Sequence, residues 1–300
     1  MCASTLPFDR ARLAPFEGGG ARASSALARS IGGCRLTFDA PEGTTRLKAR
    51  DQRAPARILT PRDRATGLAG ATLVNEAGGL AGGDRLDNTI EVGPDARAVV
   101  TTQAAEKVYR STGPASVIAT ELSVSDDGWL EWLPQETILF DRAHLRRLTT
   151  ARVAPEGRLL AGELLVLGRT AHGERVSGAH LLERWRVHRA DRLVWADGLR
   201  LDPPNASLDA PAGFAGQLAT ATLIYAAPDA PDHLHTAREV LTAHAHARTT
   251  AGVSVVGGLL LIRALAADGA ALRRTVADVW SDLRHTLAGL PARVPAAWHT

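Results

Sequence analysis

The sequence contains little cysteine, little lysine and no long hydrophobic run. Only Cys2 and Cys34 occur among 300 residues, and they do not form a Cys-x-x-Cys pair. A disulfide framework, a cysteine-rich metal module and a thioredoxin-like redox site are therefore excluded, and a reducing compartment is expected. The longest apolar run, residues 253–262, is interrupted by Ser254 and two glycines. It is about half of the ~20 residues that a membrane helix needs. We expect a cytoplasmic protein without a membrane segment.

Acidic and basic side chains are nearly balanced. The chain has 35 Lys or Arg against 32 Asp or Glu, a formal net charge of +3, and only Lys48 and Lys107 are lysines. A protein that binds nucleic acid through bulk charge carries a larger excess of basic residues. The sequence therefore indicates no nucleic-acid partner.

Alternating apolar residues dominate residues 31–226 and predict β-strands. Turn signals interrupt the alternation near residues 94, 127, 156 and 191, about thirty residues apart. Each is interpreted as a β-hairpin reversal. Segments of helical length are missing between the strands, which argues against βαβ units. The segments do not repeat in sequence, so a solenoid is not predicted.

Two helices are predicted toward the C-terminus. One runs from a cap at Asp232 to about Arg248, and the other follows Asp268 and stops at Gly289. A buried strand, interrupted by Gly257 and Gly258, is predicted between them, over residues 253–265. The second helix carries one apolar stripe, formed by Leu272, Val276, Val279, Trp280, Leu283 and Leu287.

The predicted fold class is mostly β: an elongated multi-stranded β body with two α-helices toward the C-terminus. A flexible N-terminal arm is expected over residues 1–30, followed by one β-rich domain over residues 31–300. Four tryptophans in predicted strands are assigned to the core: Trp129, Trp132, Trp185 and Trp195.

The glycine-rich loop at residues 78–84 lacks nucleotide-binding chemistry. A P-loop needs Lys and then Ser or Thr after its second glycine, whereas Asp84 and Arg85 follow here. The loop is interpreted as a tight backbone crossing with positive φ angles. Ser254 lacks the Gly-x-Ser-x-Gly spacing of a nucleophile elbow and is assigned to a strand.

Histidines and acidic residues invite a metal interpretation. On one helix His233 and His244 would lie about 16 Å apart, too far to share an ion, so exposed helix histidines are expected. Several acidic residues lie among apolar neighbours, and two interpretations stay open. They pair with arginines such as Arg110, Arg142 or Arg169, or they line a polar path for a cation such as Ni²⁺. These acidic residues are Glu131, Glu136, Asp141, Glu163 and Glu174.

Six segments, in order over residues 40–299, resemble the urease accessory protein UreD (UreH) family. Two departures are visible: His172 stands where the family usually has methionine, and residues 295–298 read Pro-Ala-Ala-Trp where Pro-Arg-x-Trp is more frequent. Residues 1–30 match nothing in the family. The six segments are LVNEAGGLAGGDRL (73–86), TTQAAEKVYRS (101–111), LEWLPQETILFDRA (130–143), GELLVLGRTAHGERVSG (162–178), RLVWADGLRL (192–201) and the tail AGVSVVGGLLLIRALAADGAALRRTVADVWSDLR (251–284).

The resemblance implies a mostly β fold with two helices and no enzymatic activity. It implies that the chain binds UreF, which recruits the GTPase UreG, and that the assembly docks on apo-urease (UreABC). There it would assist GTP-dependent nickel insertion, with UreE as the nickel donor. No stably bound cofactor is expected, because nickel would be handled only in transit.

The family is proposed to pass nickel through an internal tunnel. By match to family motifs, the residues that would line it here are Asp84, Thr101, Thr102, Glu136, Asp141, Glu163 and Glu174. Structural or interface roles are assigned to Lys107, Tyr109, Arg110 and Arg169. Two alternatives remain: a β-rich hydrolase with an unrecognised site, and a weak nickel-storage protein that uses His233, His235, His244 and His246.

Overall fold

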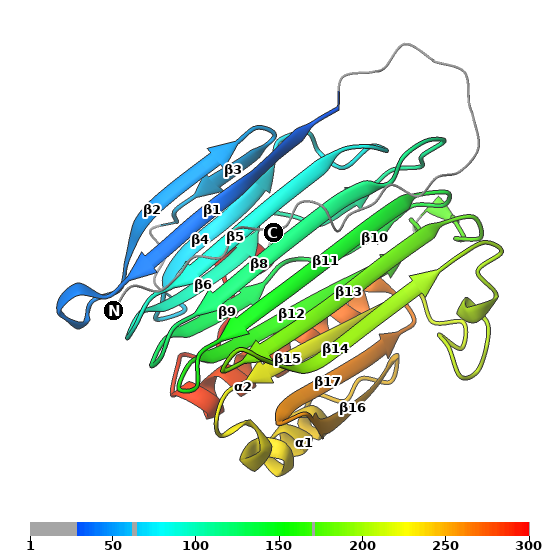
Figure 1. Ribbon diagram of the computed structural model, residues 1–300. Helices are drawn as coiled ribbons and strands as arrows, with labels where there is room; N and C mark the ends of the chain where they lie inside the picture. Colours follow the sequence, from blue (N-terminus) through cyan, green and yellow to red (C-terminus); the bar gives the residue numbers. More distant parts are fainter. Residues whose placement is uncertain (1–28, 62–64, 170–171, 300) are drawn as a thin grey trace.

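The structure is a computed structural model that describes residues 29–61, 65–169 and 172–299. Within these residues the chain forms two stacked β-sheets with two α-helices on one side (Figure 1). The mostly β fold with two late helices is therefore confirmed. Of the expected N-terminal arm, residues 1–28 lie outside the described residues.

The first sheet has seven strands in the described part of the chain, ordered β14-β13-β11-β8-β5-β1-β2. Most neighbours in it are parallel, and only the β1–β2 and β13–β14 pairs are antiparallel. In chain order its strands are β1 (Ile31–Asp39), β2 (Arg46–Arg53), β5 (Arg85–Val92), β8 (Ser116–Val124), β11 (His144–Val153), β13 (His180–Arg189) and β14 (Arg192–Leu201).

The second sheet is ordered β16-β17-β15-β12-β9-β6-β4-β3; the short strand β10 pairs with β12, and the short strand β7 pairs with β10. Its central strands β12, β9, β6 and β4 are parallel, and both ends are antiparallel. Its strands are β3 (Ala56–Leu59), β4 (Ala69–Asn75), β6 (Arg97–Thr102), β7 (Glu106–Val108), β9 (Trp129–Leu133), β10 (Thr137–Leu139), β12 (Arg158–Leu167), β15 (Ala219–Ala226), β16 (Thr249–Val256) and β17 (Leu259–Ala266).

The chain winds between the two sheets. Strands β4, β6, β9 and β12 of the second sheet alternate along the chain with β5, β8, β11 and β13 of the first. Each strand therefore pairs with the equivalent strand one winding earlier, without a crossover helix. Among the described residues no α-helix lies between these strands, so the prediction against βαβ units is confirmed there. The solenoid-like winding was not predicted, because the windings have a common length but do not share a sequence motif.

Three of the four predicted hairpins are wrong. The turns near residues 94, 127 and 156 each lead from the first sheet into the second. They stack on one another: the amide of Ser125 donates to the carbonyl of Val92 (2.9 Å), and the amide of Ala154 donates to that of Val124 (2.9 Å). The spacing of about thirty residues is thus the length of one winding. The fourth turn, at residues 190–191, does join the antiparallel hairpin β13–β14.

The buried strand predicted at residues 253–265 is instead two strands, which are divided at the glycines where the prediction placed an interruption. Gly257 and Gly258, with φ of 58° and 79°, form the turn of the antiparallel hairpin β16–β17. Positive φ at two successive positions is the geometry that tight hairpin turns require and that glycine adopts most easily.

The helices are α1 (Leu234–Ala243) and α2 (Gly269–Ala288), with 3-10 turns at Pro41–Gly43, Ala206–Leu208, Ala230–His233 and Ala296–His299. The caps of α2 are as predicted: the Asp268 side chain accepts from the Ala271 amide (2.7 Å), and Gly289 ends the helix with φ of 62°. The first helix is shorter than predicted, and its N-cap is His233 rather than Asp232. No helix within the described residues is both long and apolar enough to cross a membrane.

Two hydrophobic layers hold this arrangement together. The inner layer fills the space between the sheets and contains Trp132, Trp185 and Trp195. The outer layer lies between the second sheet and the helices and contains Trp129 and Trp280. All four tryptophans assigned to the core are buried there.

The glycine-rich loop is a tight crossing, as predicted. Gly78 and Gly83 have φ of 71° and 91°. A Cβ atom on Gly79 would lie 2.6 Å from the Tyr109 ring and 2.8 Å from the Lys107 carbonyl. The backbone therefore passes where no larger residue fits.

Candidate functional site

A cavity of about 180 Å³, the central cavity, lies between the two sheets. Its wall is partly polar on both sides, with Asn88, Thr120 and Thr149 from the first sheet and Thr102 at the end of β6. The exposed Lys107 also lines it, so the cavity reaches the surface beside β7.

A second cavity of about 610 Å³, the side cavity, lies farther along the sandwich. Asp197 of β14 and Arg263 of β17, which form an ion pair, line it together with Thr222 of β15. Arg147 and Glu163 line both cavities. These two side chains therefore stand where the cavities meet.

Arg147 is the centre of a buried polar network. Its Nε lies 2.6 Å from Glu163 Oε1, and its guanidinium also donates to Glu183. Its Nη1 donates to the Thr137 hydroxyl at 2.6 Å. The Trp185 indole N–H donates to the other oxygen of Glu163. One guanidinium thus contacts two carboxylates between the sheets.

Strand register explains how these residues meet. Arg147 of β11 is the direct partner of Glu183 on the parallel strand β13. Side chains alternate between the faces of a strand, so residues 145, 147 and 149 face the interior. Glu163 reaches the same point from β12 of the opposite sheet. The network therefore ties the two sheets together.

Burial and, to a smaller extent, the nearby Glu183 raise the pKa of Glu163 to about 8, although Arg147 opposes them. One guanidinium faces both carboxylates, so its attraction only partly offsets the effect of burial on the pKa of Glu163. Glu106, close to the surface end of the central cavity, behaves similarly. Burial raises its pKa to about 7, opposed by the 3.0 Å hydrogen bond from the Asn75 side chain.

Thr101 and Glu136 help to anchor the C-terminal tail. The Thr101 hydroxyl donates to the Leu133 carbonyl (2.6 Å) and accepts from the Trp298 indole (3.1 Å). Glu136 pairs at 2.9 Å with Arg273, which also donates to the Trp298 carbonyl. Neither residue lines the central cavity.

Asp141, Glu174 and Arg169 form a separate loop cluster. Burial opposes ionisation of Asp141, but the amides of Ser177 and Gly178 donate to it and lower its pKa. Hydrogen bonds from the Arg169 side chain lower the pKa of Glu174. These contacts join the loop after β12 to Asp141, which lies between β10 and β11.

The other residues that the sequence singled out lie elsewhere in the structure. Buried Asp84 accepts from the amides of Ser30 (2.9 Å) and Ala81 (2.8 Å) and so closes the glycine-rich loop. The Tyr109 hydroxyl donates to the Gly78 carbonyl (2.9 Å). Arg110 is exposed and makes an isolated β-bridge to Ala143. Of the seven predicted path residues, the structure places Thr102 and Glu163 on the central cavity.

The acidic residues pair with arginines, one of the two interpretations left open. Asp141 contacts Arg142 and Glu174 contacts Arg169, as named. The remaining partners were not anticipated: Arg284 for Glu131, Arg273 for Glu136 and Arg147 for Glu163. Two of these arginines lie in α2, far along the chain from the carboxylates they contact. The local sequence therefore does not indicate these pairs.

The four histidines do not form one metal site. His233 and His235 each lie near an acidic residue of their own segment, and His244 and His246 contact Asp282 and Asp278 of α2. Among the described residues no group of three or more His, Cys, Asp or Glu is arranged to hold a metal ion.

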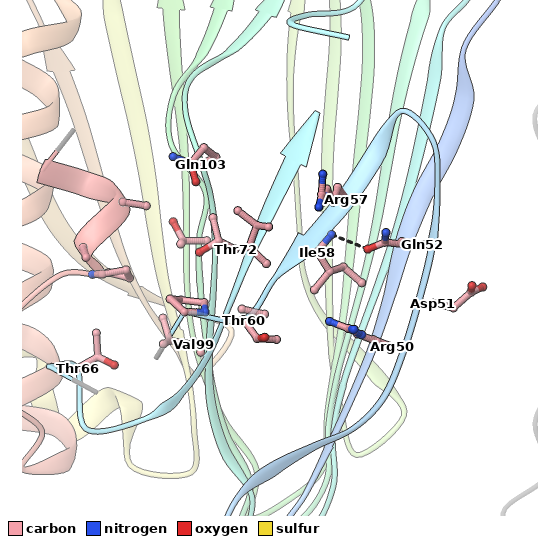
Figure 2. A pocket seen from close by; sticks show the side chains of 18 residues that line it. Arg50, Asp51, Gln52, Arg57, Ile58, Thr60, Thr66, Thr72, Val99 and Gln103 are labelled. Atoms are coloured by element: carbon pink, nitrogen blue, oxygen red, sulfur yellow. Dashed lines mark hydrogen bonds between the residues drawn. The ribbon is translucent and has the colours of Figure 1, made fainter. Parts of the chain in front are cut away.

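An edge cleft of about 860 Å³ opens between β2, β4 and the C-terminal tail. Figure 2 shows Ile58, Gln52 and Arg50 on one side and Thr72 and Val99 on the other. The Gln52 side chain accepts from the Ile58 amide at 2.9 Å, so it covers part of the outer edge of β3.

Sequence reasoning missed Arg147, Glu183 and Glu106. Arg147 follows Arg146, and only the strand register shows which of the two points inward. Glu106 lies within the segment 101–111 that resembles the family, but its hydrogen-bond partner Asn75 comes from the end of β4.

The fold and the cavities define a class: a solenoid-like β protein with a polar network between its sheets. The chain belongs to the UreD family, because the family model described as UreD urease accessory protein matches residues 30–299. Membership of an accessory-protein family agrees with the expectation of a chain that is not an enzyme.

Curated relatives support the same family. The chain is 45% identical to the urease accessory protein UreD of Methylobacterium sp. (strain 4-46), over 86% of this chain and 90% of the relative. It is 41% identical to the UreD protein of Magnetococcus marinus, over 90% and 94% of the two chains. The UreD protein of Granulibacter bethesdensis is 45% identical over 76% of this chain and 94% of its own.

Proposed function

We propose that this chain is a non-enzymatic scaffold in urease maturation. It binds apo-urease together with UreF and the GTPase UreG and assists GTP-dependent insertion of nickel, with UreE as the donor. It works in the cytoplasm and holds nickel only in transit. Family membership and the relatives' names support the accessory role.

The observation that carries the nickel path is the meeting of two cavities at one carboxylate. Glu163 lines both the central cavity and the side cavity, and its oxygens face Arg147 and Trp185. In the proposal nickel enters near Glu106, passes Thr102 and Glu163, and leaves beside Asp197. Isolated oxygen ligands hold Ni²⁺ weakly, whereas a closed set of nitrogen or sulfur ligands would retain it.

The other residues predicted from the family motifs support this path indirectly. Asp84, Thr101, Glu136, Asp141 and Glu174 hold loops and the tail through the bonds described above. Their replacement would affect these local contacts rather than the ligands along the path.

The test compares Glu163→Gln with Glu174→Gln in cells that express urease and its accessory proteins. Both changes remove one carboxylate charge, but only Glu163 lines the cavities. We expect both variants to assemble with urease in pull-downs and only Glu163→Gln to give urease of reduced nickel content and activity. Normal nickel content with Glu163→Gln, in complexes that assemble, would refute the path. Normal urease activity in cells that lack the chain, at low nickel supply, would refute the scaffold role.

A further inference from the structure

Arg147 occupies the junction of the two cavities. Its side chain is only 7% exposed, as is that of Glu163, and both residues line both cavities. A positively charged side chain therefore lies at the place where an ion would have to pass from one cavity to the other.

The guanidinium also uses the oxygens that such an ion would need. It contacts Glu163 Oε1 from one sheet and Glu183 Oε2 from the other, and the hydroxyl of Thr137 completes its hydrogen bonds. Carboxylate oxygens from opposite walls of a passage are ligands for a divalent cation. Arg147 and a divalent cation therefore compete for the same oxygens, and their positive charges exclude simultaneous occupancy.

The central cavity offers the guanidinium another position. Thr149 lies two residues farther along β11 on the same face, and its direct partner on β8 is Thr120. Asn88, the partner of Thr120 on β5, extends this polar wall. An arginine side chain is long and flexible, so it can turn toward these oxygens without movement of its strand.

We propose that Arg147 is the gate of the passage: its guanidinium closes the junction in the free protein, and a divalent cation crosses only when Arg147 leaves Glu163 and Glu183. This inference rests on the proposed nickel path. In the closed state the free chain binds no Ni²⁺ at the junction, which keeps the path empty until the gate opens.

The experiment measures Ni²⁺ binding to the full chain by equilibrium dialysis, with Ni²⁺ alone as the probe. Arg147→Gln exposes Glu163 and Glu183 to the ion, and we expect it to bind one Ni²⁺ more per chain than the wild type. The extra ion should be lost in the variant that also carries Glu163→Gln and Glu183→Gln. Arg273→Gln, which removes another arginine from a carboxylate but lies off the passage, is the matched control and should gain no such ion.

Circular dichroism checks that each variant is folded. If Arg147→Gln fails to fold, Arg147→Lys keeps the charge but lacks the fork that bridges both carboxylates and Thr137. We expect Arg147→Lys to bind the same extra ion with an affinity at least tenfold lower than that of a folded Arg147→Gln chain. Its affinity should still exceed that of the wild type. A folded Arg147 variant that binds no more Ni²⁺ than the wild type overturns the gate. The path itself fails separately, if Glu163→Gln leaves nickel insertion unchanged.

Discussion

Glu131 of β9 and Arg284 of α2 form an ion pair in which neither side chain is exposed to solvent. The indole N–H groups of Trp129 and Trp280 also donate to Glu131, and Arg284 donates to the carbonyl of Thr66 (2.7 Å). The pair therefore fixes the long C-terminal helix on the second sheet.

Removal of the Glu131 charge should be costly. Glu131→Gln leaves the Arg284 guanidinium buried without its counterion, which costs about 3–5 kcal/mol of unfolding free energy. Urea denaturation followed by circular dichroism measures this loss. Glu91→Gln breaks an exposed pair with Arg35 and should cost less than about 1 kcal/mol. Equal losses in the two variants would contradict the role assigned to the buried pair.

The glycine-rich loop offers a comparison between neighbours. A Cβ on Gly79 would collide with the Tyr109 ring and the Lys107 carbonyl, whereas a Cβ on Gly78 would meet nothing within 4 Å. Gly78→Ala should therefore cost only about 1 kcal/mol, for a left-handed φ. Gly79→Ala should cost roughly 2–3 kcal/mol, since strain and collision add. Thermal unfolding measures the stability of the two variants. A Gly78→Ala chain that is less stable than Gly79→Ala would be inconsistent with the tight crossing.

Glu106 should make the stability of the chain depend on pH. Burial raises its pKa to about 7 in the folded chain, whereas an unfolded glutamate has a pKa of about 4.3. Between these values the folded chain holds more protons than the unfolded one, so this contribution to stability falls as the pH rises from about 4 to about 7. Above that range the loss is complete.

Glu106→Gln removes this dependence and keeps a side-chain oxygen for Asn75. We expect the variant to match the wild type at pH 4.5 and to exceed its unfolding free energy by roughly 3 kcal/mol at pH 8. Urea titrations at four pH values measure the difference. Glu76→Gln, at an exposed carboxylate that pairs with Arg57, is the control. A constant difference between Glu106→Gln and wild type at all pH values would rule out this explanation.

Much of the fold could be predicted from local sequence. Alternation located the strands, and Asp268, the apolar stripe and Gly289 located α2, because caps and amphipathicity are local properties. The winding could not be predicted in this way. A strand–turn–strand pattern such as residues 90–100 is compatible with a hairpin and with a turn between two sheets. Only the partners of each strand, which lie one winding away, decide between them.

The candidate site was predictable only in part. Glu163 drew notice because a charged residue stood in an apolar strand, and Thr102 because it lay in a segment that resembles the family. Arg147 and Glu183 lie in strands with several charged residues, so their inward direction depends on register. Their meeting with Glu163 depends on the packing of one sheet on the other.

The most direct test of the nickel path is to block the central cavity. Thr149 is buried and lines it, whereas Thr150, the next residue on β11, points to the other face. Urease is purified from cells that carry Thr149→Phe or Thr150→Phe, after pull-downs establish that both chains still assemble with it, and its nickel is measured per active site. The account predicts normal nickel with Thr150→Phe and at least a tenfold loss with Thr149→Phe. Full nickel content with an assembled Thr149→Phe chain would contradict passage through the interior.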